Sequence, residues 1–447
     1  MSSTQAVIRT QTTSIIGAQW LNSDFSVFQP QGPALSKAHI RENIKHTPRN
    51  GDFAPGRSVR FEVQRDIDVN TQLTLRFKAS GLGAPAGAFT RWVDLLGLWS
   101  WSKLTIKSGT QLLQTVYPLE LLIAANKFLD FEQRGNFLKE VGAGTPAERS
   151  ASALAAKEIS CPMLTLLGLN LYGDMSQSLY VRGLNDQLSV DISLVPANEV
   201  IESDVALPAE PAAGWYQDGH LDVEGFHLNN EERKRLAYCY KQTPHAITFD
   251  DQQYAAQSIV PAGTALPTTW TYDLQNINQP VTCMAFVLRW KDDLERRTAE
   301  AGGTQGRNLS NIAGWYSPGG GSNAIVESFQ IRSGNNDVLA TISAERLVGY
   351  QHTRDFKGES GVAIPAWSYS HDASMKNAVL GFVSFDQIER PRVVVQFRQP
   401  TLGAAHATVG SAANADIGTT SDLVIDLVGF TKMQIEQANF LLSRPFN

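Results

Sequence analysis

Histidines and carboxylates are the residues of this chain that could do chemistry, because they bind metals and transfer protons near neutral pH. A metal site of the cupin type needs a His-x-His pair beside a carboxylate, and none of the eight histidines is placed in that way. His220 and His227 lie on opposite phases of a strand that is expected to slip between them, so they are not expected to share a ligand. The sequence therefore predicts neither a metal site nor a cofactor.

Catalytic motifs with a known mechanism are also missing from the sequence. It contains no Gly-x-Ser-x-Gly turn, no phosphate-binding P-loop and no His-Glu-x-x-His helix. The carboxylate pairs Asp250-Asp251 and Asp292-Asp293 are adjacent in sequence, so a strand would send the two side chains of each pair to opposite faces. We interpret them as surface charge, and we predict no catalytic residue and no enzymatic activity.

Aromatic residues offer a second kind of site. Trp99 and Trp101 are two apart, so in a strand they would share one face, which fits the core or a subunit interface better than a platform for a sugar ring. Trp315 and Tyr316 lie in a long Gly-rich segment and are expected to be exposed. Asn308 begins the chain's single glycosylation-type sequon, which makes it a candidate for modification.

Cysteine usage and charge restrict the possibilities further. Cys161, Cys239 and Cys283 are widely separated and form no Cys-x-x-Cys pair, which indicates buried free thiols rather than disulfides or a zinc site. The formal net charge is −6, and the only locally basic stretch, "ERKR", adjoins two glutamates. Direct binding to nucleic acid is therefore not expected, because phosphate contacts need clustered Lys and Arg.

The 447-residue length suggests two or three domains, and the composition is that of a globular protein. No apolar run is long enough to span a bilayer, and the N-terminus lacks the layout of a secretory signal, so synthesis and folding in the cytosol are expected. Most periodic segments alternate with the period of a strand, as in "RSVRFEVQRDIDV", "LSVDISLV" and "RPRVVVQF". Helices are predicted in "PLELLIAANKFLDF" and in "TPAERSASALAAKE", where Thr145, Pro146 and Glu148 form a capping sequence.

Three pairs of segments recur in the same order along the chain. "WSKLTIKSGTQLLQTV" matches "VESFQIRSGNNDVLATIS", "LTLRF" matches "FVLRW", and "LSVDISLVP" matches "RPRVVVQFRQP". We interpret them as two copies of one strand-rich domain, in which Ser108-Gly109 and Ser333-Gly334 occupy equivalent turns. The Pro- and Ala-rich residues 206–218 are expected to link the copies.

The segment after this linker, "HLDVEGFHLNNEERKRLA", is expected to begin the second copy. Its apolar positions change phase at Gly225, which predicts a β-bulge there. Asn230 is predicted to cap a short helix whose first turn is acidic and whose second turn is basic, the order that a helix dipole favours.

Several of these segments resemble, in the same order, landmarks of the major capsid proteins of nucleocytoplasmic large DNA viruses. "HLDVEGFHLNNEERKRLA" is similar to the strand and Asp/Asn-Glu-Arg-Arg-type turn that open the second jelly roll of that family. "RWVDLLGLWSWSKLTIKSGTQLL" resembles its Trp-then-Leu-Gly segment, which leads into a strand and a Gly turn. "FQIRSGNND" and "VSFDQIERPRVVVQF" resemble two further strands, so the likeness extends over most of the chain from about Arg57.

The resemblance implies an all-β fold of two tandem eight-stranded jelly rolls with short helical insertions. The expected organisation is an N-terminal arm (1–24), a first roll (25–205), a linker (206–218) and a second roll (219–447). Such a chain would be a structural subunit that forms a homotrimer, a pseudo-hexagonal capsomer that tiles an icosahedral shell. Its partners would be neighbouring capsomers, minor capsid and penton proteins, and an internal membrane on the inner face. It would lie in the virion after assembly in the host cytoplasm.

The alternative is a two-domain β-sandwich that binds carbohydrate or processes glycans. A stable trimer in solution would favour the capsid subunit, whereas a monomer that binds glycans would favour the alternative. Two further expectations follow from composition: residues 1–24 form an arm outside the first roll, and the Gly-rich segment 299–323 is a loop that tolerates excision of Gly302 to Gly306. Ile331 is expected on the core face of a strand.

Overall fold

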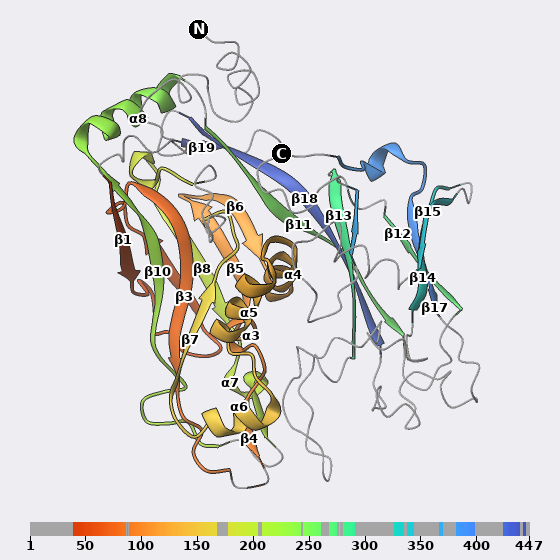
Figure 1. The fold of residues 1–447 in the computed structure, drawn as a ribbon, viewed down its shortest axis with the longest axis horizontal. Coiled ribbons are helices and arrows are strands. Elements are labelled where there is room, and N and C mark those ends of the chain that lie inside the picture. Colours follow the sequence, from red (N-terminus) through yellow and green to blue (C-terminus); the bar gives the residue numbers. More distant parts are fainter. Residues whose placement is uncertain are drawn as a thin grey trace.

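The structure is a computed structural model of the chain. It describes residues 39–85, 87, 89–167, 178–203, 208–242, 245–260, 268–274, 277, 280–290, 326–334, 338–343, 366–369, 381–397, 423–438 and 441–443. Figure 1 shows two β-rich halves, the first at the left of the view and the second at the right.

The first half consists mainly of two four-stranded antiparallel sheets, which we call the first roll. One sheet has the order β1-β10-β3-β7 and the other has the order β2-β8-β5-β6. The strands are β1 (His39–His46), β2 (Ser58–Val63), β3 (Val69–Ala79), β5 (Trp101–Ser108), β6 (Gln111–Val116), β7 (Lys157–Pro162), β8 (Leu188–Leu194) and β10 (Tyr216–Leu228). Alternate residues of these strands, such as Val59, Phe61 and Val63, are buried between the sheets, as a period of two requires.

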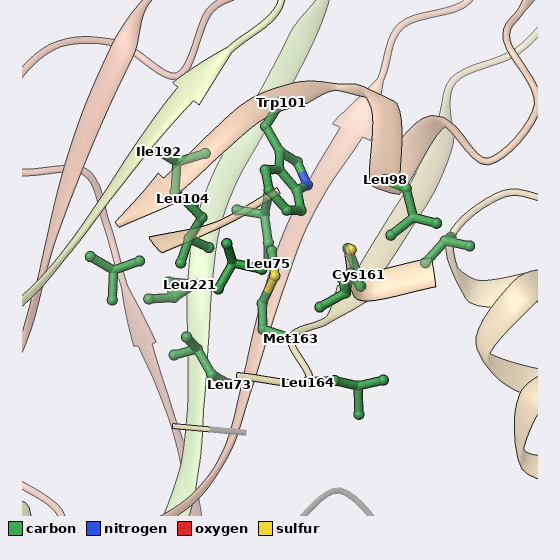
Figure 2. Packing of buried hydrophobic residues seen from close by; sticks show 14 of the residues in the cluster. Leu73, Leu75, Leu98, Trp101, Leu104, Cys161, Met163, Leu164, Ile192 and Leu221 are labelled. Atoms are coloured by element: carbon green, nitrogen blue, oxygen red, sulfur yellow. The ribbon is translucent and has the colours of Figure 1, made fainter. Parts of the chain in front are cut away.

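Figure 2 shows the centre of this core, where side chains from both sheets meet. Leu73 and Leu75 of β3 and Leu221 of β10 pack with Leu104 and Ile192 from the opposite sheet. All five side chains are fully buried. Burial of large aliphatic side chains contributes roughly 1.5–3 kcal/mol each, so this layer holds the first roll together.

The second half, which we call the second roll, repeats this architecture. Its sheets have the orders β11-β18-β13-β16 and β12-β17-β14-β15, and a further short strand pairs with β18. The strands are β11 (His245–Val260), β12 (Thr269–Asp273), β13 (Val281–Trp290), β14 (Val326–Arg332), β15 (Val338–Ser343), β16 (Ala366–Ser368), β17 (Arg392–Phe397), β18 (Leu423–Ala438) and β19 (Leu441–Ser443).

The two rolls correspond strand by strand. In each roll the described strands of the two main sheets number eight, and the first, last, third and sixth of them form one sheet in that order. The three recurring sequence pairs fall on corresponding strands: β5–β6 with β14–β15, β3 with β13, and β8 with β17. The expected fold class, two tandem eight-stranded jelly rolls, is therefore confirmed.

The two Ser-Gly turns confirm the correspondence at atomic detail. The Gly109 N–H donates to the Gln187 carbonyl at 2.9 Å, and the Gly334 N–H donates to the Glu389 carbonyl at 2.6 Å. Gln187 lies directly before β8, which pairs with β5, and Glu389 lies shortly before β17, which pairs with β14. The register of each hairpin also shifts at the same place, directly after Ile106 in the first roll and after Ile331 in the second.

The interpretation of "HLDVEGFHL" as the first strand of the second half is wrong. These residues belong to β10, which pairs with β1 on one side and β3 on the other, so they complete the first roll. The division expected at 206–218 is moved accordingly, and Trp215 and Tyr216 are buried against the first roll rather than extended as a linker. The physical reason is topological, because each roll inserts its last strand between its first and third.

The bulge expected at Gly225 is confirmed, since the register between β10 and β3 shifts between Glu224 and Gly225. A Cβ at Gly225 would lie 2.2 Å from the Val69 carbonyl oxygen and 2.3 Å from Cγ2 of Ile67, so only glycine fits there. The corresponding strand of the second roll carries "IDLVGF" (425–430) where β10 carries "LDVEGF" (221–226), a fourth recurring pair.

Most of the described helices lie between strands of the first half, and one connects the first roll to the second. Both predicted helices are present, and Thr145 caps α6 (Pro146–Ser152) through reciprocal hydrogen bonds with Glu148. A helix follows β10 as expected, although it is longer than a short turn. The remaining elements are β4 (Thr90–Trp92), α3 (Leu96–Trp99), α4 (Pro118–Phe128), α5 (Phe131–Glu140), α6 (Pro146–Ser152), η2 (Val181–Gly183), α7 (Ala197–Val200), β9 (Ile201–Ser203), α8 (Asn230–Gln242) and η4 (Phe385–Gln387). Among the described helices, none has the length and apolar character needed to cross a membrane.

Candidate functional site: the junction between the two rolls

The residues that the sequence singled out for chemistry do not converge. His220 lies 3.4 Å from the Asp222 carboxylate, while His227 contacts Glu42, so each histidine has a separate acidic neighbour. Within the described part of the chain, no group of three or more His, Cys, Asp or Glu side chains could hold a metal ion. Asn308, the Asp292-Asp293 pair and the segment 299–323 with its aromatic residues lie outside the described residues, as does the arm 1–24.

The two tryptophans are core residues rather than a sugar platform. Trp99 ends helix α3 and Trp101 begins β5, so the expectation that they share one face of a strand is wrong. Both are buried, with exposed fractions of 4% and 1%. The Trp101 indole N–H donates to the Gly97 carbonyl at 3.0 Å, and its ring points into the core in Figure 2. Neither ring can stack on a ligand.

The cysteines are free thiols, as expected. Cys161 and Cys283 are buried and Cys239 is half-buried. Burial raises the pKa of the Cys161 thiol and, less strongly, that of Cys239. A raised pKa keeps a thiol protonated and unreactive, so these residues pack as small apolar side chains.

The junction between the rolls brings together buried side chains from both halves, and strand β13 shows how it is built. Cys283, Ala285 and Val287 join the hydrophobic cluster of the first roll. Phe286, on the other face of the same strand, stacks on Phe329 of β14 with ring centroids 4.2 Å apart. The strand is therefore buried on both faces, one against its own roll and one against its neighbour.

The junction core also includes residues from the other two long strands of that sheet. Ile247 and Phe249 of β11 and Phe430 of β18 belong to the same cluster as the core of the first roll. Their exposed fractions are 0%, 1% and 4%. Because these residues belong to the hydrophobic cluster of the first roll, the two rolls meet across an apolar, buried interface rather than a wet one.

Three polar contacts fix the register of this junction. The Gln437 side chain of β18 bonds both backbone groups of Tyr180: its amide N–H₂ donates to the Tyr180 carbonyl at 2.8 Å, and its carbonyl accepts from the Tyr180 N–H at 3.3 Å. His245 of β11 donates from Nε2 to the Ser178 carbonyl at 3.3 Å. Burial lowers the pKa of His245 to about 4, so the ring is neutral at pH 7.

Helix α4 brings two ionisable residues to the junction. Glu120 is 6% exposed and accepts a hydrogen bond from the Tyr117 N–H at 3.0 Å. Burial raises the pKa of Glu120 well above its usual value, and the nearby Asp251 carboxylate of β11 acts in the same direction. Lys127, which is 1% exposed, lies 5.6 Å from the ring centroid of Phe430 in the second roll. The helix thus contacts the second roll with buried side chains.

A buried carboxylate anchors the helix that leads into the second roll. Asp68 is fully buried, and its Oδ2 accepts from the Leu228 N–H at 2.7 Å and from Nε of Arg233 at 2.8 Å. Nε of Arg182 lies 3.6 Å from the other carboxylate oxygen. Arg233 belongs to the "NNEERKRLA" segment, so its charge is an internal contact that holds α8 against the first roll.

The fold and the junction together define a double jelly-roll protein. Among solved structures, the chain is similar to PBCV-1 VP54, fitted into a reconstruction of the virophage Sputnik, with a TM-score of 0.69 and 15% identity over 94% of this chain and 100% of that one. It is also similar to the Faustovirus major capsid protein, with a TM-score of 0.61 and 9% identity over 91% and 92% of the two chains. A structure of the Sputnik virophage matches with a TM-score of 0.53 and 9% identity over 94% of this chain and 91% of that one.

No protein-family model matches the chain, and no curated protein matches it either. The resemblance to major capsid proteins of large DNA viruses is thus confirmed through the fold.

Proposed function

We propose that the chain is a viral major capsid protein, a structural subunit that trimerises into pseudo-hexagonal capsomers of an icosahedral shell. The observation that carries the proposal is that two rolls of identical strand order pack against each other through a buried apolar interface. Three such chains would present six comparable rolls around a threefold axis, and a closed ring of that kind has a nearly hexagonal outline. The solved structures of similar fold support the same role, since they include a Faustovirus major capsid protein and a PBCV-1 capsid.

The proposed partners follow from this role. They are two further copies of the chain, neighbouring capsomers, minor capsid and penton proteins, and an internal viral membrane on the inner face. The protein would be found in the virion after assembly in the host cytoplasm. A trimer would carry a formal charge of 3 × −6 = −18, which opposes direct packing against DNA.

No catalytic role is proposed for any residue. Residues 1–24 are proposed to order against a neighbouring subunit or minor protein, so their deletion should leave the trimer intact and impair shell assembly.

The test of the proposed function is the mass and shape of the purified protein. Mass photometry should give 3 × 48.9 kDa, or about 147 kDa, and negative-stain electron microscopy should show pseudo-hexagonal particles. A monomer at all concentrations would contradict the proposal.

A variant pair separates folding from association in the second roll. Ile331 is 4% exposed on β14, so Ile331→Asp buries a charge and should abolish soluble trimer. Thr271 is exposed on β12 of the same sheet, and Thr271→Asp should assemble like the wild type. Normal trimer yield from Ile331→Asp would show that this residue is not part of a core that assembly requires.

A further inference from the structure

We propose that one exposed face of helix α8 binds the anionic surface of a phospholipid bilayer. This inference rests on the proposed function, which includes an internal viral membrane, and it names the element of the chain that would meet such a membrane. The face consists of Lys234, Arg235, Tyr238 and Lys241, and we call it the basic face. All four residues are exposed in the single chain.

The first observation is the position of α8 in the molecule. Figure 1 shows the helix at one end of the first roll, beyond the ends of β1 and β10, while α6 and β4 lie at the opposite end. A helix at the end of a roll can contact a flat partner without any rearrangement of the sheets. The position of α8 therefore suits an extended surface.

The second observation is that contacts on the other side of α8 fix its orientation. Arg233 donates from Nε to the fully buried Asp68 carboxylate at 2.8 Å, and Leu236 is 5% exposed. The cations of the basic face lie three or four residues from Tyr238 along the helix, so they share its side. The basic face therefore points away from the first roll, and no folding of a disordered segment is needed to form it.

The third observation is an excess of positive charge on this helix. Residues 230–242 contain four cationic side chains and two glutamates, a formal charge of 4 − 2 = +2. Arg182 adds a further cation beside the anchor, because its Nε lies 3.6 Å from the Asp68 carboxylate. The helices at the opposite end, α6 and α7, have formal charges of 1 − 1 = 0 and 0 − 1 = −1. Although the whole chain is acidic, its α8 end favours an anionic partner.

The fourth observation favours a bilayer among anionic partners. Tyr238 is 60% exposed at the centre of the basic face. An amphipathic aromatic ring is stable at the headgroup level of a membrane, where its apolar body and its hydroxyl meet different surroundings. Lysine and arginine side chains extend to lipid phosphates at the same level, and each strengthens binding to an anionic leaflet about fivefold. Three cations together contribute about 100-fold.

The experiment measures flotation of the full-length protein with vesicles of equimolar phosphatidylserine and phosphatidylcholine. A triple variant, Lys234→Gln with Arg235→Gln and Lys241→Gln, removes the three cations of the basic face and leaves Tyr238 and the Arg233 anchor in place. Half-maximal binding of this variant should need at least about 30-fold more lipid than that of the wild type. Vesicles of phosphatidylcholine alone should bind neither protein.

The matched control is Arg57→Gln with Lys103→Gln and Lys139→Gln, which removes three exposed cations outside α8 and changes the net charge by the same amount. It should bind anionic vesicles like the wild type. Circular dichroism and thermal melting establish that both triple variants are folded. Binding of the wild type to a short DNA duplex as strongly as to anionic vesicles would overturn the assignment of a bilayer as the partner.

A second measurement uses the wild type alone and does not depend on a variant that folds. With anionic lipid at about ten times the half-maximal concentration, acetylation of Lys234 and Lys241 should slow at least about fivefold, while that of Lys103 should not change.

Several results would overturn the assignment of the basic face and leave the proposed function standing. They are a wild-type trimer that does not bind anionic vesicles, equal vesicle binding by the wild type and the basic-face variant, an equal loss of binding in both triple variants, and unchanged labelling of all three lysines. A wild type that forms no trimer in mass photometry would instead contradict the proposed function.

Discussion

Acid should weaken the junction between the rolls through a single histidine. The pKa of His245 is about 4 in the folded chain, against an ordinary value of 6.5. Between these two pH values the unfolded chain binds a proton at His245 that the folded chain does not. The contribution of the buried neutral ring to the free energy of unfolding is therefore fully present above about pH 6.5 and is lost as pH falls toward 4. The two pKa values differ by 6.5 − 4 = 2.5, so the free energy of unfolding falls by about 3 kcal/mol once the pH is below both values. At pH 5 the loss is about 2 kcal/mol.

The matching perturbation replaces His245 with Gln, whose amide can still donate toward the Ser178 carbonyl but does not titrate. Urea unfolding followed by tryptophan fluorescence at pH 7.5 and pH 5.0 gives the free energy of unfolding for both proteins. Other acidic groups titrate in both, so the difference between wild type and variant isolates His245. The wild type should lose about 2 kcal/mol more than His245→Gln on acidification. An equal loss in both proteins would refute the assignment of a buried neutral ring at the junction.

Two further substitutions test the parts of the fold that the sequence motifs surround. Gly225→Ala should lower the free energy of unfolding by at least about 2 kcal/mol, because its Cβ would overlap the backbone of β3. Gly135→Ala, in open space on α5, should raise the free energy of unfolding by about 0.5–1 kcal/mol. Equal effects of the two substitutions in thermal melting would contradict the close approach of Gly225 to β3. Arg233→Ala should cost about 3 kcal/mol because it leaves the fully buried Asp68 carboxylate short of a partner, while Lys234→Ala, at an exposed position of the same helix, should cost less than about 0.5 kcal/mol. Unfolding of the two variants at the same urea concentration would exclude Asp68 as the anchor.

The correspondence of the two rolls could be predicted because core positions and turns leave local signals. Alternating apolar residues and a glycine turn, as at Ile106 to Gly109 and Ile331 to Gly334, are visible in any short window of sequence. Their hydrogen bonds then proved equivalent in the structure. The capping sequence at Thr145 was predictable for the same reason, since its partner Glu148 is three residues away.

The position of β10 could not be read in this way. β10 pairs with β1, and residues that meet there, such as Asn43 and Asp222, are 179 positions apart in the sequence. No local sequence signal indicates which sheet such a distant strand completes. The recurrence of "LDVEGF" as "IDLVGF" was the available clue, because it equates β10 with the closing strand of the second roll. Helix α5 was missed because its interior contains Gly135, which lowers helix propensity.

The contacts of the junction residues likewise could not be predicted from the sequence. Gln437 and Tyr180 are 257 residues apart, and Arg233 and Asp68 are 165 apart. One local signal did exist, in the unbroken apolar run of "CMAFV" at 283–287. A run without alternation is typical of a strand buried on both faces, which is how β13 lies in the structure.

The place of β10 also sets an order of events during synthesis on the ribosome. All strands of the first roll have been made once the chain reaches Leu228, so this roll can close before any strand of the second emerges. The second roll must wait for β18, near the end of the chain, and its Ala285 and Val287 face then meets a surface that is already folded. We therefore expect the first roll to provide the folded surface on which this face of the second roll packs. An isolated second roll would leave the apolar face exposed and is expected to self-associate.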